Sequence, residues 1–222
     1  MNKQMKEFCE KKNSSYDYYS EITYKRIKSP ITVLIGPNGT VKSMSLRGII
    51  SYLKKNNIKY VSYSTSKDDI VSRGSSPFGS WDISKIACAF HSEGERMTDS
   101  FFDWANSNML RGVLEDKECP LFVLIDEADS GLSIDRLHQT LEQIVYIAKT
   151  EYERGRDIHF IFTCNSYEML ECLQSDITDV IWVPTKQSVH IKSYEKFKKP
   201  YIEYFEVMHH EDEWYWRKKK KV

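Results

Sequence analysis

Residues 31–43 read ITVLIGPNGTVKS, and this stretch decides the fold. A run of apolar and β-branched residues leads into a glycine-rich turn, then a lysine, a serine and a helical pattern. Strand, turn and helix N-terminus in this order form a phosphate-binding loop, because backbone N–H groups in such a turn converge on phosphate oxygens. The lysine adds positive charge and the serine hydroxyl can bind Mg²⁺. The predicted phosphate-binding residues are Gly36, Pro37, Asn38, Gly39, Thr40, Val41, Lys42 and Ser43.

One residue departs from the pattern of such loops. The position before Lys42 is normally glycine, and here it is Val41. Glycine leaves room for the backbone to approach a phosphate, whereas a β-branched side chain fills that space and restricts the backbone. Val41 therefore predicts weakened or altered phosphate binding, unless the loop adapts. The alternative is that Val41 is a change introduced into an otherwise active enzyme.

A second motif ends the apolar run 121–125, where Asp126 and Glu127 follow. An aspartate at the end of a buried strand, beside a phosphate loop, can hold Mg²⁺ through the Ser43 hydroxyl or a water. The adjacent glutamate can polarise a water for in-line attack on a γ-phosphate. Two solvated acids at a strand end are the alternative. The phosphate loop earlier in the chain favours Asp126 as a metal ligand and Glu127 as a catalytic residue.

A third motif lies at Ser92 and Glu95, which have the spacing of a capping box at a helix N-terminus. The exposed N–H groups of such a terminus also form a phosphate site. Taken alone, Ser92 and Glu95 fit an ordinary helix cap better than a phosphate site, and Ser92, Gly94 and Glu95 become predicted nucleotide contacts only through a family resemblance.

Together these motifs resemble those of the ATP-binding-cassette (ABC) ATPases, in particular the soluble, non-transporter branch. That branch includes recombination and repair ATPases and small prokaryotic and phage relatives. Residues 36–43 resemble its Walker A loop, 92–95 its signature, 121–127 its Walker B strand and 129–135 its D-loop. The motifs stand in the family's order within residues 30–185, so the resemblance implies a minimal ATPase head.

The resemblance implies a nucleotide-dependent switch that uses ATP and Mg²⁺. Two copies would form a head-to-tail homodimer around ATP, with Ser92 and Gly94 of one copy capping the γ-phosphate bound by the other. Glu127 would be the base for slow hydrolysis, and a protein partner would respond to the nucleotide state. DNA metabolism, defence or phage–host conflict would be the setting by association of family with role.

Two further departures from the family's sequence pattern favour a different function. No glutamine occurs between Ser43 and His138, so the family's glutamine ligand for Mg²⁺ is missing. Asn165 stands where the family has a histidine, and asparagine can hydrogen-bond a γ-phosphate or a water but cannot carry a proton. The alternative function is a hydrolysis-deficient scaffold or inhibitor of the same fold that binds a protein or nucleic-acid partner. Asn165 is the predicted γ-phosphate sensor in the ATPase reading.

Strand and helix patterns alternate along the chain, which predicts an α/β P-loop fold with a mostly parallel sheet flanked by helices. We expect a single domain over 1–222, with a C-terminal extension at about 190–222. Within the extension, the composition of 201–205 is strand-like and 209–213 reads as a polar turn. The predicted strands are 31–35, 59–65, 121–125, 158–163 and 180–183, and the predicted helices surround 46–53, 137–152 and 169–173.

The composition bears on whether the chain binds nucleic acid or membranes. The chain has 32 Lys and Arg against 32 Asp and Glu, so its zero net charge gives no support for nucleic-acid binding. The basic end, 214–222, with its two tryptophans, reads as a solubilising tail or as a clamp for single-stranded nucleic acid. The chain has no apolar run long enough for a membrane span and no signal-peptide core, so we expect a cytoplasmic protein that does not bind membranes.

Overall fold

A computed structural model describes most of the segments that carry these motifs. The described residues are 27–38, 42–64, 101, 103–105, 120–127, 129 and 134–219, with the backbone alone for 134–136 and 208–219. The strands are β1 (Ile31–Ile35), β2 (Lys59–Ser64), β3 (Leu121–Asp126), β4 (Ile158–Cys164), β5 (Thr178–Trp182) and β6 (Gln187–Ser188). The helices are α2 (Lys42–Lys55), α8 (Ile134–Glu153), α9 (Tyr167–Leu173) and α10 (Tyr194–Lys219).

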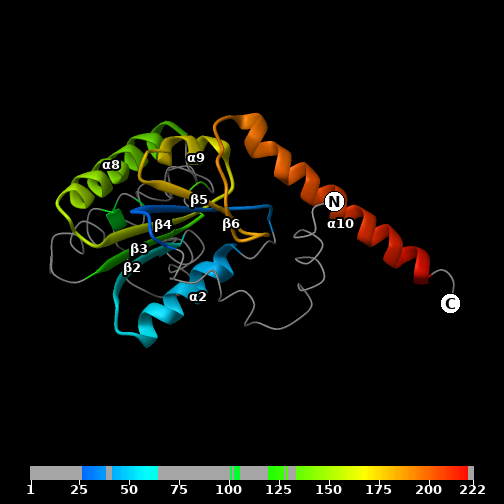
Figure 1. Cartoon of the computed structure of the whole chain (residues 1–222), viewed down its shortest axis with the longest axis horizontal. Coiled ribbons are helices and arrows are strands. Elements are labelled where there is room, and N and C mark those ends of the chain that lie inside the picture. Colours follow the sequence, from blue (N-terminus) through cyan, green and yellow to red (C-terminus); the bar gives the residue numbers. More distant parts are fainter. Residues whose placement is uncertain are drawn as a thin grey trace, which may run out of the picture.

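The strands form one sheet in the order β2-β3-β4-β1-β5-β6 (Figure 1). All neighbours are parallel except β5 and β6, which are antiparallel. Ile35 at the end of β1 is in register with Cys164 of β4 and Trp182 of β5. The carboxyl ends of the central strands therefore lie at one edge of the sheet, where ligands bind in open α/β folds. The predicted α/β fold with a mostly parallel sheet is confirmed.

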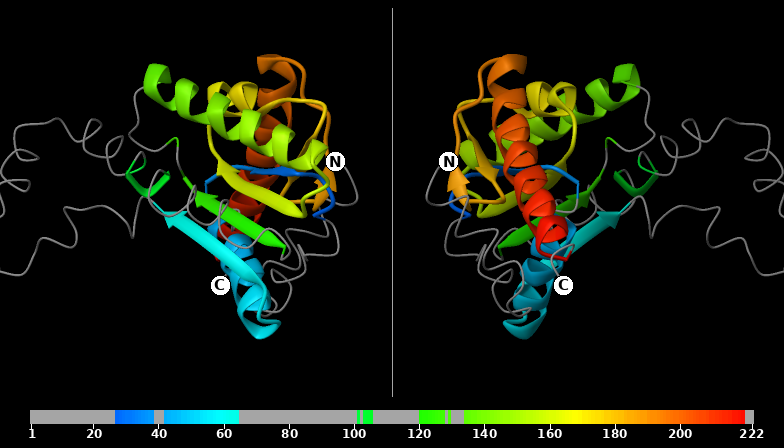
Figure 2. Two further views of the ribbon diagram at one scale, coloured as in Figure 1. Left: turned by 90° about the vertical axis from the view of Figure 1, so that its left-hand side faces the viewer. Right: turned by 90° about the vertical axis from the view of Figure 1, so that its right-hand side faces the viewer.

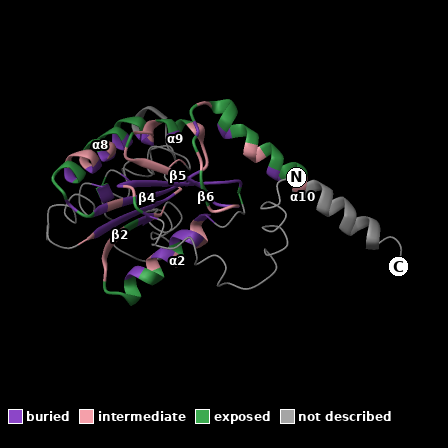
Figure 3. Cartoon of the chain, in the orientation of Figure 1, coloured by how far each residue is buried: buried purple, intermediate pink, exposed green. Residues whose placement is uncertain are grey.

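Helices cover both faces of the sheet, with α2 on one face and α8 and α9 on the other (Figures 1 and 2). Side chains alternate between these faces along each strand, as the pleat requires. Leu34, Leu124 and Ile161 pack with Leu46 and Leu53 of α2. The strands between the two helical layers are buried on both sides (Figure 3), which explains why their sequences are continuously apolar.

The opposite face holds the larger apolar cluster. Val33, Val123 and Phe160 from the strands join Leu141 of α8 and Leu170 of α9 in it. The first half of α10 completes this layer, while its second half extends away from the sheet (Figure 1). The five predicted strands and the predicted helices around 46–53, 137–152 and 169–173 are confirmed to within a few residues at their ends. The start of the helix predicted at Ser92 lies outside the described residues.

The structure corrects the prediction for the C-terminal extension. Residues 201–205 are not a strand and 209–213 are not a turn, because both lie within α10. Phe197, Tyr201 and Tyr204 are spaced i, i+4 and i+7, which places them on one face of a helix that packs on the core. The aromatic composition suggested a strand, but the spacing decides the structure. The prediction of a single domain over 1–222 also concerns residues outside the described ranges and stays a prediction.

None of the helices in the described part of the chain is long and apolar enough to cross a membrane. The longest, α10, has charged residues along its length.

Candidate functional site

The phosphate loop begins where the sequence predicts it, directly after β1. Gly36 and Pro37 are buried and Asn38 is exposed. The first residue of α2 is Lys42, so Lys42 and Ser43 lie in the first turn of a helix that starts at the carboxyl edge of the sheet. Gly39, Thr40 and Val41 lie outside the described residues, and the predicted effect of Val41 stays a prediction.

The Lys42 ammonium is held against the start of the loop. Its Nζ donates hydrogen bonds to the carbonyl oxygens of Gly36 at 2.5 Å and Pro37 at 3.2 Å. Only 5% of the residue is exposed, and this burial lowers the pKa of the lysine. Glu127 opposes the shift most strongly, followed by Asp129. The carboxylates thus favour the charged form of an ammonium that burial disfavours.

Ser43, Asp126 and Thr163 meet between α2 and the sheet. Asp126 follows Phe122 and Leu124 on the face of β3 that packs against α2, and Thr163 follows Ile161 on the same face of β4. The Ser43 hydroxyl donates to Asp126 Oδ1 at 3.1 Å, and the Thr163 hydroxyl donates to the same oxygen at 2.6 Å. The two predicted metal ligands, Ser43 and Asp126, are therefore in direct contact, and their role at Mg²⁺ stays a prediction.

Glu127 has an unusual backbone conformation. Its φ is 55°, in the left-handed region that is costly for residues other than glycine. The Glu127 N–H donates to Thr163 Oγ1 at 2.8 Å, so one threonine fixes both acids of the motif. Burial raises the pKa of the Glu127 carboxyl, and the neighbouring Asp126 raises it further. A raised pKa suits a group that must accept a proton.

Asn165 follows β4 and is held by Asp129. Asp129 Oδ2 accepts hydrogen bonds from the backbone N–H of Asn165 at 2.8 Å and of Ser166 at 2.7 Å. Ser166 is the N-cap of α9, and its hydroxyl accepts from the Met169 N–H. Asp129, two residues beyond Glu127, therefore joins the Walker B segment to the turn that carries Asn165.

Asn165 also leaves an acceptor without a partner. Its Oδ1 is buried and accepts no hydrogen bond within the described part of the chain, and Asp129 Oδ1 is in the same situation. Buried polar atoms are normally paired, so an unpaired one at a site needs an explanation. An ordered water or a polar ligand group beside Asn165 would supply the missing hydrogen bond.

The donor set fits Mg²⁺ and a phosphate chain. Ser43 and Asp126 offer the hard oxygen ligands that Mg²⁺ prefers, and magnesium in nucleotide enzymes is bound by one or two protein groups together with substrate phosphates. The described residues contain no group of three or more His, Cys, Asp or Glu side chains that could hold a metal by themselves. Ser43 and Asp126 would hold Mg²⁺ together with the phosphate oxygens of a bound nucleotide.

Two residues that contribute hydrogen bonds to the site were not predicted from the sequence. Thr163 was treated as part of a buried strand, although a polar residue at the end of an apolar run, two positions before Asn165, signals a specific hydrogen bond. Tyr201 of α10 was also missed, and its hydroxyl accepts a hydrogen bond from the Gly36 N–H at 3.2 Å. The helical spacing of Phe197, Tyr201 and Tyr204 could have placed Tyr201 on the core side of a helix.

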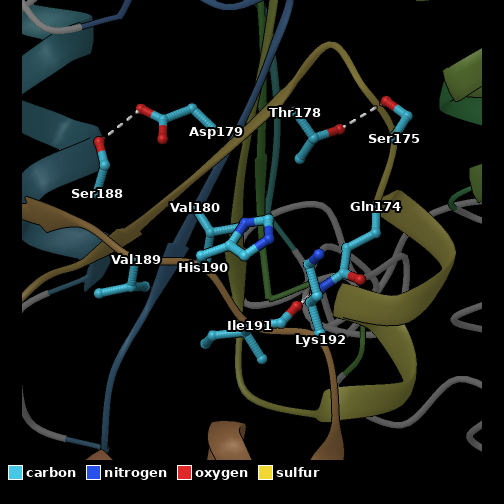
Figure 4. A pocket seen from close by; sticks show the side chains of 10 residues that line it. All are labelled: Gln174, Ser175, Thr178, Asp179, Val180, Ser188, Val189, His190, Ile191 and Lys192. Carbon is cyan, nitrogen blue, oxygen red and sulfur yellow. Dashed lines mark hydrogen bonds between the residues drawn. The ribbon is translucent and has the colours of Figure 1, made fainter.

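A hollow of about 480 Å³ lies at the other end of β5, and none of the predicted site residues lines it (Figure 4). Several of its polar groups already pair with one another. Ser188 Oγ donates to Asp179 at 3.1 Å, and the Ser175 and Thr178 hydroxyls are 2.8 Å apart. Thr178 pairs with Ile31 at the start of β1, whereas the phosphate loop leaves β1 at Ile35. This hollow is therefore separate from the phosphate site.

The comparisons with known proteins agree with this geometry. A family model described as "ATPase family associated with various cellular activities (AAA)" matches residues 32–181, from β1 to β5 and more than half of the chain. The chain belongs to the AAA family of ATPases. This assignment identifies the fold as an AAA P-loop domain and supports a nucleotide-binding ATPase function. A search of curated proteins finds no match.

The AAA assignment supports the P-loop part of the resemblance but does not single out the cassette branch. The matched range contains the loop at 36–43, Asp126, Glu127 and Asn165. The structure gathers the described loop residues, 36–38, 42 and 43, with the other three at one edge of the sheet. The matched range also contains Ser92, Gly94 and Glu95, which lie outside the described residues. Their predicted contact with nucleotide stays a prediction.

Proposed function

We propose that this AAA protein hydrolyses ATP with Mg²⁺ and uses the bound nucleotide as a switch. The observation that carries the proposal is the hydrogen-bonded group of Ser43, Asp126 and Thr163, with Glu127 held beside it in a strained conformation. A structural role alone does not require a glutamate at a left-handed position, where glycine or asparagine would be less costly.

Each residue has a defined part in this proposal. Lys42 and the loop N–H groups bind the phosphates, and Ser43 and Asp126 hold the metal. When bound, Mg²⁺ neutralises charge on the phosphate oxygens. Glu127 orients the attacking water and accepts its proton. Asn165 contacts that water or the terminal phosphate, and Asp129 fixes its position.

The arrangement of subunits is a second part of the proposal. The resemblance to cassette ATPases supports a head-to-tail homodimer in which Ser92, Gly94 and Glu95 of one copy complete the nucleotide site of the other. A protein partner would then read the dimer's nucleotide state. This part is supported by the sequence motifs alone.

The test replaces Glu127 with Gln, which keeps the size of the side chain and one acceptor oxygen but removes the base. We expect ATP binding to persist and hydrolysis to fall by about 10²- to 10⁴-fold, the usual contribution of a general base. Binding is measured by calorimetry, and phosphate release gives the hydrolysis rate. Glu153→Gln is the matched control, because Glu153 is exposed at the end of α8 and should leave both quantities unchanged.

The same variant tests the dimer. With ATP and Mg²⁺, Glu127→Gln should elute as a dimer from a sizing column, because the bound nucleotide is no longer consumed. Elution as a monomer at saturating ATP would overturn the dimer but not the hydrolase.

Val41 favours the scaffold as a second candidate. If the wild-type protein does not hydrolyse ATP, the hydrolase is overturned and the scaffold is supported, whether or not ATP binds.

A further inference from the structure

The C-terminal helix α10 packs against the start of the phosphate loop. The Tyr201 ring lies 4.8 Å from the Phe197 ring on the same helix and 5.0 Å from the Trp182 ring at the end of β5, measured between centroids. The Trp182 contact is edge-on, with the ring planes 66° apart. Phe197 and Trp182 are buried, so aromatic contacts on two sides fix the position of the tyrosine hydroxyl.

The hydroxyl of Tyr201 accepts the hydrogen bond of the Gly36 N–H at 3.2 Å, across 165 positions of sequence. Gly36 is buried, and a buried backbone N–H without a partner is costly. Burial raises the pKa of the Tyr201 hydroxyl, with Cys164 adding to the shift, so the hydroxyl stays neutral at physiological pH. The first peptide of the loop is therefore bonded to the C-terminal helix.

Gly36 also contacts the phosphate-binding lysine. Its carbonyl oxygen accepts the hydrogen bond from Lys42 Nζ. The N–H and C=O groups of one glycine therefore join the α10 hydroxyl to the buried ammonium. A change in the lysine's partners at the loop and a change in the position of α10 both act on Gly36.

We propose that Tyr201 is a positioning residue that couples the phosphate loop to α10, so that nucleotide binding and the packing of α10 stabilise each other. This inference rests on the proposed function. Coupling between two sites is reciprocal, so a bond that prepares the loop for nucleotide must also hold α10 more firmly when nucleotide is bound. The second half of α10 extends away from the sheet (Figure 1).

The experiment compares wild type, Tyr201→Phe and Tyr194→Phe. Tyr201→Phe removes the hydroxyl and keeps the ring. Tyr194→Phe deletes the same atom from the same helix at a position that is 52% exposed and has its ring against Tyr167, not the loop. Calorimetry gives the dissociation constant for a β,γ-imido analogue of ATP with Mg²⁺. Hydrogen exchange of 194–207, with and without the analogue, reports on α10.

We expect Tyr201→Phe to weaken analogue binding about fivefold, the size of one net hydrogen bond. The analogue should slow exchange in α10 of wild type and of Tyr194→Phe, and should no longer slow it in Tyr201→Phe. Loss of a merely structural contact would change exchange equally with and without the analogue.

Three results are informative in different ways. Failure of wild type to bind the analogue overturns the proposed function. Binding by wild type without slower exchange in α10, or full retention of that effect in Tyr201→Phe, overturns the coupling alone. If Tyr201→Phe is too unstable to compare, Phe197→Leu loosens the ring's packing and leaves the hydroxyl. Unchanged analogue affinity in Phe197→Leu would then also overturn the coupling.

Discussion

The two faces of the sheet contribute different parts of one site. On the α2 side of the site, Ser43 and Thr163 donate to a single oxygen of Asp126. On the α10 side, Asp129 and Tyr201 accept hydrogen bonds from backbone N–H groups. In the proposed function, the oxygen atoms of the first group hold a cation. The second group holds the segments at Gly36 and Asn165, which carry the phosphate loop and the proposed sensor.

The two sides therefore differ in role: residues on the α2 side take part in the reaction, and residues on the α10 side hold other residues in position. Residues on the α2 side can contact a metal, so their loss should remove a step of the reaction. Residues on the α10 side act through other residues, so their loss should misplace groups that remain present. The same substitution, an aspartate changed to asparagine, can be made on each side, and the comparison predicts unequal results.

The largest effect is expected from Asp126→Asn. The variant keeps the shape of the side chain but loses the negative charge that Ser43 and Thr163 surround. We expect hydrolysis with saturating Mg²⁺ to fall by about 10²- to 10³-fold, the cost of removing one preorganised electrostatic group. The Mg²⁺ concentration needed for half-maximal rate should rise as well. A titration of the hydrolysis rate with Mg²⁺ measures both.

Asp179→Asn is the matched control for Asp126→Asn. Asp179 also accepts a hydroxyl hydrogen bond, from Ser188, but lies at the other end of β5. An unchanged Mg²⁺ dependence in Asp126→Asn would place the metal elsewhere and end the distinction between the two sides.

The α2 side was largely predictable from the sequence. Its ligands follow directly from a loop and a strand whose patterns are local, and the parallel sheet brings strand ends together whatever the rest of the chain does. Lys42, Ser43, Asp126 and Glu127 were identified for this reason. Thr163 was missed because the alternation that turns it toward α2 is known only once the faces of the sheet are assigned.

The α10 side was not predictable in the same way. Tyr201 meets Gly36 only after a helix of the C-terminal extension has packed on the sheet, and no local pattern links two residues so far apart. Its segment was also expected to be a strand, since tyrosine, isoleucine and phenylalanine favour strands. Packing of one helical face on the core overrode that preference. Asp129 was recognised as part of a motif, but its bond to the turn before α9 depends on the tertiary structure.

An intermediate effect is expected from Asp129→Asn. Asparagine can still accept from the N–H groups of Asn165 and Ser166, but charge-assisted hydrogen bonds are about twice as strong as neutral ones. The turn should therefore loosen without losing all its contacts. We expect kcat to fall about tenfold while the Mg²⁺ concentration for half-maximal rate stays the same. The same Mg²⁺ titration measures both, so the two aspartates are compared directly.

A rise in the Mg²⁺ requirement of Asp129→Asn would show that the α10 side also holds the metal. Thermal unfolding of the variant is the accompanying control. A Tm close to that of wild type assigns the loss of rate to the sensor turn and not to unfolding.

The smallest effect is expected in the pH dependence of kcat/KM, which reports ionisation in the free enzyme. Glu127 must be ionised to accept a proton, and burial raises its pKa. The rate should therefore fall on the acid side at a higher pH than an ordinary glutamate would give. Lys42 must be charged, and burial lowers its pKa, so the alkaline fall should begin below the pH expected for an ordinary lysine.

The bell-shaped plot of kcat/KM against pH should therefore be narrower than one calculated from the ordinary pKa values of glutamate and lysine. The fall in rate on the acid side belongs to Glu127 if it is absent from the residual activity of Glu127→Gln.

The pH dependence of stability gives a further check on the direction of the Glu127 pKa shift. A glutamate with a raised pKa binds its proton more tightly in the folded protein, so its ionised form opposes folding above that pKa. The neutral variant Glu127→Gln should then unfold at a slightly higher Tm than wild type at neutral pH, with the difference shrinking as the pH falls. If kcat/KM falls on the acid side at the ordinary pKa of glutamate, burial does not tune Glu127 for proton transfer.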